Sequence, residues 1–267
     1  MAKISVESRE LFNSKIVPYK EEINKRLTKE KEILSLIQKD NSGAGYKKLF
    51  LCDDQIYVAT VWITINGLSV ELLDTKNNDA LNEARKSLYK AIINLEEIVT
   101  GVINCPFSEI EDKLAGIENT PLEKRFYLVK KLGLAIQLLI EAFGENTKWK
   151  WSFVELQGRY CTVAKNLIDM KKACKDYFDP SSADYDNTVY YIRLLLKLLD
   201  QSATQYRDRY ELSTHRIDDM TAAINYLLAL RRLQILLNMK DEAEDLKKKA
   251  IVWKEKMEAD HKAGIAS

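Results

Sequence analysis

The sequence predicts an all-α protein built from long antiparallel helices. Apolar residues recur at alternating steps of three and four along most of the chain, as they do on one face of a helix. Only 9 glycines and 4 prolines interrupt the 267 residues, which is too few for a fold of many short strands. The periodic segments are joined by short connections, which place consecutive helices antiparallel. We therefore expect an elongated multi-helix bundle in a single domain, residues 1–267.

The first helices are expected to precede an unusually apolar segment. A short helix over residues 5–17 should end before Pro18, because proline disrupts a helix interior. Residues 19–39 carry apolar side chains on one stripe and charged side chains elsewhere, which is typical of an amphipathic helix on a core. The segment 40–45, DNSGAG, is expected to be a loop.

Residues 56–70, IYVATVWITINGLSV, contain no charged residue, and two structures fit them. The many β-branched residues and the Asn66-Gly67 pair are typical of a β-hairpin. The flanking segments have helical periodicity, however, and an isolated hairpin is only marginally stable. We therefore expect a helix that is buried on every side, with a close helix crossing at Gly67, and we retain the hairpin as the alternative.

From Leu81 onward the pattern is regular, and its breaks divide the chain into further helices. Asn104-Cys105-Pro106 ends one helix, and Thr120-Pro121 is an N-cap followed by proline at the first helical position. The expected helices cover residues 81–103, 108–115, 121–143, 147–178, 186–212 and 217–237, with a last helix after Asn238. We expect about eight major helices, several of them about 22 to 30 residues long, which corresponds to roughly 33–45 Å at 1.5 Å per residue.

Composition narrows the classes of function. Lys and Arg number 41 against 40 Asp and Glu, a net charge of +1, so there is no bulk attraction to nucleic acid and we expect no nucleic-acid partner. The sequence contains no phosphate-binding loop, dinucleotide fingerprint, nucleophile elbow or Glu-x-x-His pair. We therefore expect no cofactor and no metal, and we favour a protein that is not an enzyme.

The same composition predicts a cytoplasmic location without a membrane span. The uncharged run is shorter than the roughly 20 residues that cross a bilayer, and Asp53-Asp54 precede it. The N-terminal sequence lacks the apolar core of a signal peptide. The four cysteines are scattered without a CxxC pair, as expected of reduced thiols.

Two stretches resemble the second helix of a tetratricopeptide (TPR) repeat. In that family a small residue, a large apolar residue and a second small residue follow at steps of four and three. The matching positions are Ala84, Leu88 and Ala91, and Ala243, Lys247 and Ala250. The second set departs from the pattern at its lysine, and the helices are too long for units of about 34 residues. The resemblance implies stacked helical hairpins that bind a peptide or protein.

Arg209 and His215 resemble the arginine-to-histidine motif of HEPN-type ribonucleases, which are also all-helical. The resemblance implies that His215 would act as general base on a ribose hydroxyl while Arg209 held the phosphate. Tyr210 replaces the polar residue that usually follows the arginine in that family. The alternative without catalysis places His215 at a helix end near Leu212, where the helix dipole favours a cation.

Two aromatic clusters are candidates for contact with a partner. Lysine and tryptophan alternate over residues 148–151, so one indole must point away from the apolar face of the helix. Three tyrosines gather at a helix start over residues 185–191, and tyrosine is favoured at interfaces. The candidates are Trp149, Trp151, Tyr185, Tyr190 and Tyr191.

The sequence thus predicts a non-enzymatic interaction, scaffold or structural protein. It would present a groove or a flat helical face to a helix or peptide of a protein partner, or to a second copy of itself in a homo-oligomer. The alternative is a helical ribonuclease, or another protein acting on nucleic acid, that uses Arg209 and His215.

Overall fold

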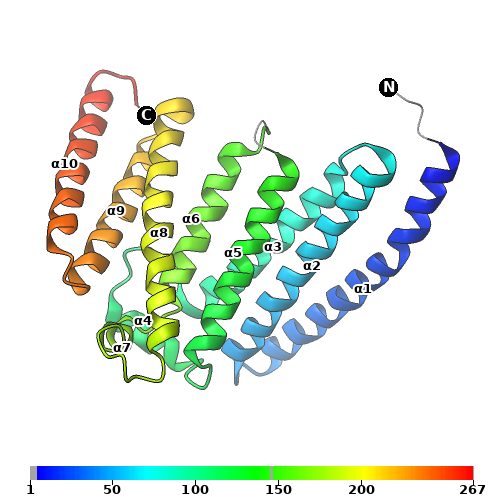
Figure 1. Ribbon diagram of the computed structural model, residues 1–267, viewed down its shortest axis with the longest axis horizontal. Coiled ribbons are helices and arrows are strands. Elements are labelled where there is room, and N and C mark those ends of the chain that lie inside the picture. Colours follow the sequence, from blue (N-terminus) through cyan, green and yellow to red (C-terminus); the bar gives the residue numbers. More distant parts are fainter. Residues whose placement is uncertain (1–4, 145–146, 267) are drawn as a thin grey trace. The chain divides into compact units, whose positions relative to one another are not determined.

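A computed structural model describes residues 5–144 and 147–266 (Figure 1), and in these ranges the chain forms helices and no strand. The predicted all-α class is therefore confirmed. The α-helices are α1 (Val6–Lys39), α2 (Ala44–Leu73), α3 (Asn78–Val99), α4 (Phe107–Ala115), α5 (Leu122–Phe143), α6 (Lys150–Asn166), α7 (Met170–Asp176), α8 (Tyr185–Arg209), α9 (Ile217–Leu236) and α10 (Lys240–Lys262). A turn of π-helix, Tyr210–Thr214, follows α8.

The chain divides into two compact units. Unit 1 comprises Met1–Ile98, Ala115–Asn119 and Tyr127–Thr147, and unit 2 comprises Val99–Leu114, Thr120–Phe126 and Lys148–Ser267. The first residues of α5 therefore belong to unit 2 and the rest of that helix to unit 1. The expectations of one domain and of an elongated bundle stay predictions.

In unit 1, α1 packs along α2 as a single helix through Pro18, so the predicted break at this proline is wrong. Phe12 and Ile16 before the proline, and Ile23 after it, are all buried in one apolar cluster with residues of α2. A proline inside a helix costs about 3 kcal/mol. Burying three large side chains on one continuous face offsets that cost, at roughly 1.5–3 kcal/mol each.

The segment around Asn66-Gly67 lies inside α2, so the hairpin alternative is wrong. The Asn66 side chain is buried, and its Oδ1 accepts a hydrogen bond from the backbone N–H of Asn77 at 2.8 Å. Ser69 Oγ donates to the carbonyl oxygen of Thr75 at 2.9 Å. Both side chains therefore hold the turn between α2 and α3, and Asn66 forms no hairpin turn of its own.

The expectation that α2 is buried on every side is also wrong. Tyr57, Thr64, Gly67 and Val70 lie on one exposed face of the helix. A Cβ atom at Gly67 would meet no atom within 4 Å, so no helix crosses there. By length and composition alone α2 could span a membrane, a property that core helices of soluble proteins share. The absence of a membrane span stays a prediction.

Unit 2 contains a row of packed helices, in which α8 contacts α6 and α9, and α9 contacts α10. Figure 1 shows α9 running antiparallel to both α8 and α10. The single helix predicted over residues 147–178 is wrong, because α6 ends at Asn166 and α7 begins at Met170. Asp169 starts α7 as its N-cap, with a side-chain oxygen that accepts from the backbone N–H of Lys172 at 3.1 Å.

Gly158 marks the closest packing between α6 and its neighbours. A Cβ atom at this position would lie 2.5 Å from Cε2 of Tyr206 and 2.9 Å from the hydroxyl of Tyr226. The two tyrosine rings stack with centroids 5.5 Å apart, and the Tyr226 hydroxyl lies 2.9 Å from Oγ1 of Thr162. The contact therefore requires a residue without a side chain.

Alanine at the two helical glycines Gly67 and Gly158 should have opposite effects on stability. Gly158→Ala should lower the free energy of unfolding by about 1–3 kcal/mol, because the tyrosines must move. Gly67→Ala should raise it by up to about 1 kcal/mol, because the added methyl group is unobstructed and glycine is a poor helix former. Urea denaturation followed by circular dichroism measures both. Changes of the same sign would contradict the packing described for these two positions.

Candidate interaction surface

One face of α2 is both uncharged and uncovered. It carries Tyr57, Thr60, Thr64, Gly67 and Val70, which lie on one side of the helix at steps of three and four. Thr60 Oγ1 donates to the carbonyl oxygen of Tyr57 at 2.7 Å, and Thr64 Oγ1 donates to that of Thr60 at 3.0 Å. Because both hydroxyl protons are used within the helix, the threonine methyl groups add to the apolar character of the face.

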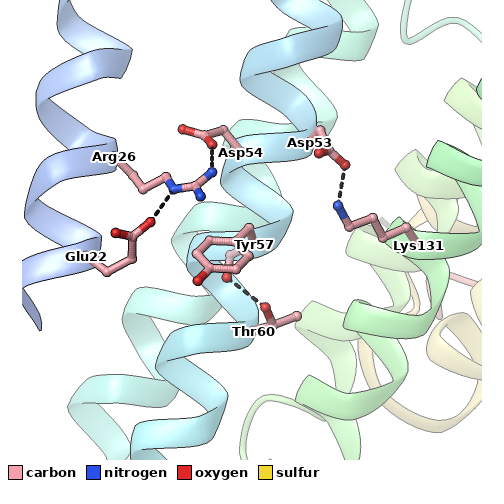
Figure 2. Close-up of polar contacts among 7 residues, drawn as sticks. All are labelled: Glu22, Arg26, Asp53, Asp54, Tyr57, Thr60 and Lys131. Atoms are coloured by element: carbon pink, nitrogen blue, oxygen red, sulfur yellow. Dashed lines mark hydrogen bonds and ion pairs between the residues drawn. The ribbon is translucent and has the colours of Figure 1, made fainter. Parts of the chain in front are cut away.

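Arg26 of α1 fixes one edge of this face. Its guanidinium forms ion pairs with Glu22, at 2.7 Å, and with Asp54, and Figure 2 shows it between these two carboxylates. The same group lies 4.3 Å from the centroid of the Tyr57 ring. Asp54 is only 4% exposed, whereas the Arg26 side chain is 33% exposed, so the carboxylate of this pair is removed from water and the guanidinium is only partly so. Arg26 thus holds both the position of α1 on α2 and the orientation of Tyr57.

Helix α5 lies on the other side, where Lys131 Nζ contacts Asp53 Oδ1 at 2.5 Å (Figure 2). Leu134 and Leu138 follow Lys131 at steps of three and four, so the three residues share a face of α5. Leu134 is 61% exposed, and Leu138 is exposed as well. At the far ends of the two helices, Lys76 Nζ donates to the carbonyl oxygen of Phe143 at 2.9 Å.

These residues together define the α2–α5 surface of unit 1. It consists of Tyr57, Thr60, Thr64, Gly67 and Val70 of α2 with Leu134 and Leu138 of α5. At the end of the surface next to Tyr57, the Asp53–Lys131 and Arg26–Asp54 ion pairs neutralise the charged side chains. At its other end Glu71 and Asp74 are exposed, and neither has an ion pair within the ranges 5–144 and 147–266. Lys76 is exposed at the same end, so these two acids and one cation leave a net charge of −1 there.

The aromatic candidates from the sequence all lie in unit 2, outside this surface. Trp149 and Trp151 are half-buried, with Nζ of the adjacent Lys148 and Lys150 at 5.3 Å and 4.9 Å from their rings. On α8, Tyr190 is well exposed and Tyr185 is half-buried.

Tyr191 differs from the other candidates because it is fully buried. Its hydroxyl donates to the carbonyl oxygen of Ala164 at 2.8 Å, and its ring stacks on Phe126 with centroids 5.0 Å apart. Burial raises the pKa of Tyr191 well above its usual value. In this conformation Tyr191 leaves no surface for a partner, so its choice as a contact residue is corrected to a packing role.

The arginine of the ribonuclease-like motif is occupied by structural contacts. Arg209 forms an ion pair with Asp219, a nearly buried carboxylate that also accepts a hydrogen bond from Thr214 Oγ1 at 2.5 Å. Its Nη1 donates to the carbonyl oxygen of Trp151 at 3.4 Å, and its guanidinium lies 4.8 Å from the Tyr206 ring centroid. Asp219 therefore already balances the charge with which this guanidinium would hold a phosphate.

The histidine of the same motif contacts a different residue. His215 is exposed, has a positive φ of 50°, and ends the π-helical turn. Its ring lies edge-on to Tyr210, with centroids 5.9 Å apart, and Tyr210 in turn donates to Asp260 at 2.8 Å. Within the described residues no hydrogen bond joins His215 to Arg209, so this geometry adds no support to the ribonuclease hypothesis.

No group of three or more His, Cys, Asp or Glu residues in the described ranges could hold a metal ion. The four cysteines are free thiols, and three of them are buried. Burial raises the pKa of the Cys161 thiol to about 12, and it also raises the pKa of Cys52. These thiols therefore have little nucleophilic character near neutral pH.

Asparagine at the adjacent residues Asp53 and Asp54 tests which ion pair supports the surface. Asp54→Asn should lower the free energy of unfolding by about 2 kcal/mol, because a buried charged hydrogen bond to Arg26 is lost. Asp53→Asn should lower it by less than about 1 kcal/mol, because the pair with Lys131 is exposed. Thermal and urea denaturation measure both variants, and equal losses would contradict the assignment of Asp54 as the structural partner.

Comparison with known proteins identifies one family. The model of the TP0443 family matches residues 8–261, which include both units almost completely. No curated protein matches the chain, and no solved structure matches it.

Proposed function

The chain belongs to the TP0443 family, and we propose that it acts without catalysis, as a helical interaction protein that binds an amphipathic helix of a protein partner on the α2–α5 surface. We place this activity in the cytoplasm, since the chain keeps its four cysteines as free thiols. The observation that carries the proposal is the uncharged, uncovered face of α2.

Such a face needs an explanation in a chain with so many charges. Lys, Arg, Asp and Glu make up 30% of the residues, yet none stands among the exposed positions of α2 between Tyr57 and Val70. A helix at the surface of a soluble protein normally has charged or polar side chains on its solvent side. Contiguous exposed apolar surface of this kind usually marks an interaction site.

The shape of the surface suits a helix. Thr60, Thr64 and Gly67 are small, and Gly67 is open to solvent, so another helix backbone could approach closely along this line. Tyr57 of α2 and Leu134 of α5 are exposed and offer larger apolar contacts. Recognition of an amphipathic helix uses apolar anchors spaced at three and four residues, which matches the spacing of this face.

The charges at the two ends of the α2–α5 surface indicate which partner helix would bind there. The cations Arg26 and Lys131 are already paired, whereas Glu71 and Asp74 at the other end are exposed acids. We therefore propose a partner helix with one apolar face and with Lys or Arg at the end that lies over these acids. Complementary charge at the rim would set its direction and accelerate association.

The TPR-like arrangement remains a further proposal. On α3, the residues Ala84, Leu88 and Ala91 are fully buried. On α10, Ala243 and Ala250 are 3% and 6% exposed. Small residues at helix contacts account for this burial equally well in any helical bundle. The proposed binding site therefore rests on the α2–α5 surface and not on the repeat pattern.

A photo-crosslinking residue in place of Thr64 tests the proposal in the native cell. The matched control replaces Thr28 of α1, an exposed threonine in the same unit whose hydroxyl also donates to its own helix, to Asn24 at 2.9 Å. Illumination should give one discrete protein adduct at position 64 and none at position 28. Mass spectrometry of the crosslinked peptide should identify an apolar helix face with a basic end.

Other outcomes of this experiment would separate the alternatives. Leu134→Asp should abolish the adduct, because it places a charge on the surface beside α2. A crosslinked peptide from this chain itself would assign the surface to a homo-oligomer instead. An RNA adduct would favour a protein acting on nucleic acid, and equal adducts at positions 28 and 64 would contradict the proposal.

A further inference from the structure

Lys165 of α6 is a buried cation without an acidic partner. Its residue surface is 7% exposed, its Nζ donates to Oδ1 of Asn166 at 2.9 Å, and it lies 5.8 Å from the Phe107 ring centroid. No carboxylate forms an ion pair with it in the part of the chain that the structure describes. A buried charge without a counter-charge is strongly unfavourable, so this arrangement calls for a ligand that supplies one.

The positive charge of Arg232 on α9 contributes to lowering the pKa of Lys165. Its Nη2 donates to Oδ1 of Asn104 at 2.5 Å, and Nδ2 of Asn104 donates to Oδ1 of Asn225 at 2.9 Å. Arg232 is half-buried, and within the described residues it too has no ion pair. Two neighbouring cations therefore share one region of unit 2, and only neutral amide groups satisfy them.

The connection between α3 and α4 holds this region together. Nδ2 of Asn166 donates to the carbonyl oxygens of Thr100 at 3.0 Å and Val102 at 3.2 Å. The same segment contributes Asn104 to Arg232 and ends at Phe107, which faces Lys165. Protein contacts thus set the positions of both cations. Binding of a ligand therefore does not carry the entropic cost of ordering these two side chains.

The protonation of Lys165 responds to this environment. Burial, with the charge of Arg232 in addition, lowers the pKa of Lys165 to about 8. The other titratable groups that influence it are the thiols of Cys105 and Cys161. The carboxylate of Glu109 on α4 accepts a hydrogen bond from the Cys105 thiol at 3.5 Å. Near pH 8 the ammonium is therefore partly deprotonated.

We propose that Lys165 and Arg232 form a binding site for a doubly charged oxyanion, a phosphate group being the biological example. A phosphate carries close to two negative charges at neutral pH, which would balance the two cations. Arginine offers a planar set of donors and lysine a compact point charge, and the two together suit a tetrahedral group with several acceptor oxygens. The half-buried Arg232 and the exposed Asn104 leave the solvent side of the site open.

Calorimetric titration with three probes tests the site and its ligand source. The probes are sulfate, inorganic phosphate and glycerol 3-phosphate, each at constant ionic strength with chloride as the reference anion. Binding of sulfate and inorganic phosphate alone assigns the site to free anions, and tighter binding of the phosphomonoester assigns it to a phosphorylated metabolite. Absence of binding by all three overturns the proposal.

Variants locate the site on the two cations. Arg232→Gln should weaken sulfate binding at least tenfold, whereas Lys248→Gln, which removes an exposed charge of unit 2 paired with Asp245, should change it less than twofold. Lys165→Met should abolish binding yet raise the Tm in anion-free buffer at pH 7, because it removes an uncompensated buried charge. Unchanged sulfate affinity in Lys165→Met overturns the proposal, and so does equal weakening by Lys248→Gln.

The pH dependence gives an independent readout, because sulfate stays doubly charged throughout. The anion favours the protonated ammonium, so its binding takes up a proton once Lys165 begins to deprotonate above pH 8. The sulfate dissociation constant of the wild type should therefore rise by up to about tenfold per pH unit above pH 8. A dissociation constant that stays flat between pH 7 and pH 10 overturns the assignment of Lys165.

Discussion

Covering α2 is the constraint on which the rest of unit 1 depends. This 30-residue helix has few charged residues, and its uncharged run can be stable in water only if other elements remove most of it from solvent. α1 covers one side with an unbroken apolar face. Asn66 and Ser69 hold the turn that brings α3 back, and Gly45 makes room for the backbone of Gly116, since a Cβ there would lie 2.9 Å from its carbonyl oxygen.

The cover that results is incomplete in a specific way. The ion pair of Arg26 with Asp54 holds α1 at one edge, and the pair of Lys131 with Asp53 holds α5 at the other. Between these two ion pairs the small residues of α2 remain exposed, and no charged side chain stands among them. A partner helix on this line would complete the burial that the chain itself leaves unfinished. Unit 2 differs in another way, because it holds two cations, the buried Lys165 and the half-buried Arg232, without an acidic partner for either.

The helical class could be predicted because apolar spacing is a local property of the sequence. The errors have physical causes that involve distant residues. Pro18 does not end α1, because contacts on both sides of it stabilise one helix, and the predicted helix 147–178 breaks where Asn166 reaches the carbonyl oxygens of a distant loop. The exposed face of α2 and the unpaired Lys165 were missed for the same reason: composition shows that a residue is apolar or charged, but not which neighbours cover it.

Alkylation of a single introduced cysteine tests the central claim, that the α2 face is open in the isolated protein and covered by a partner in the cell. Thr64→Cys and the control Thr28→Cys are compared in a Cys174→Ser background, because Cys174 is the one native thiol that is not buried. Both cysteines should react rapidly with a maleimide in the purified protein, and only the one at position 64 should be protected in intact cells. Equal reaction rates at position 64 in cells and in the purified protein would show that the face is simply solvated, which would contradict the account.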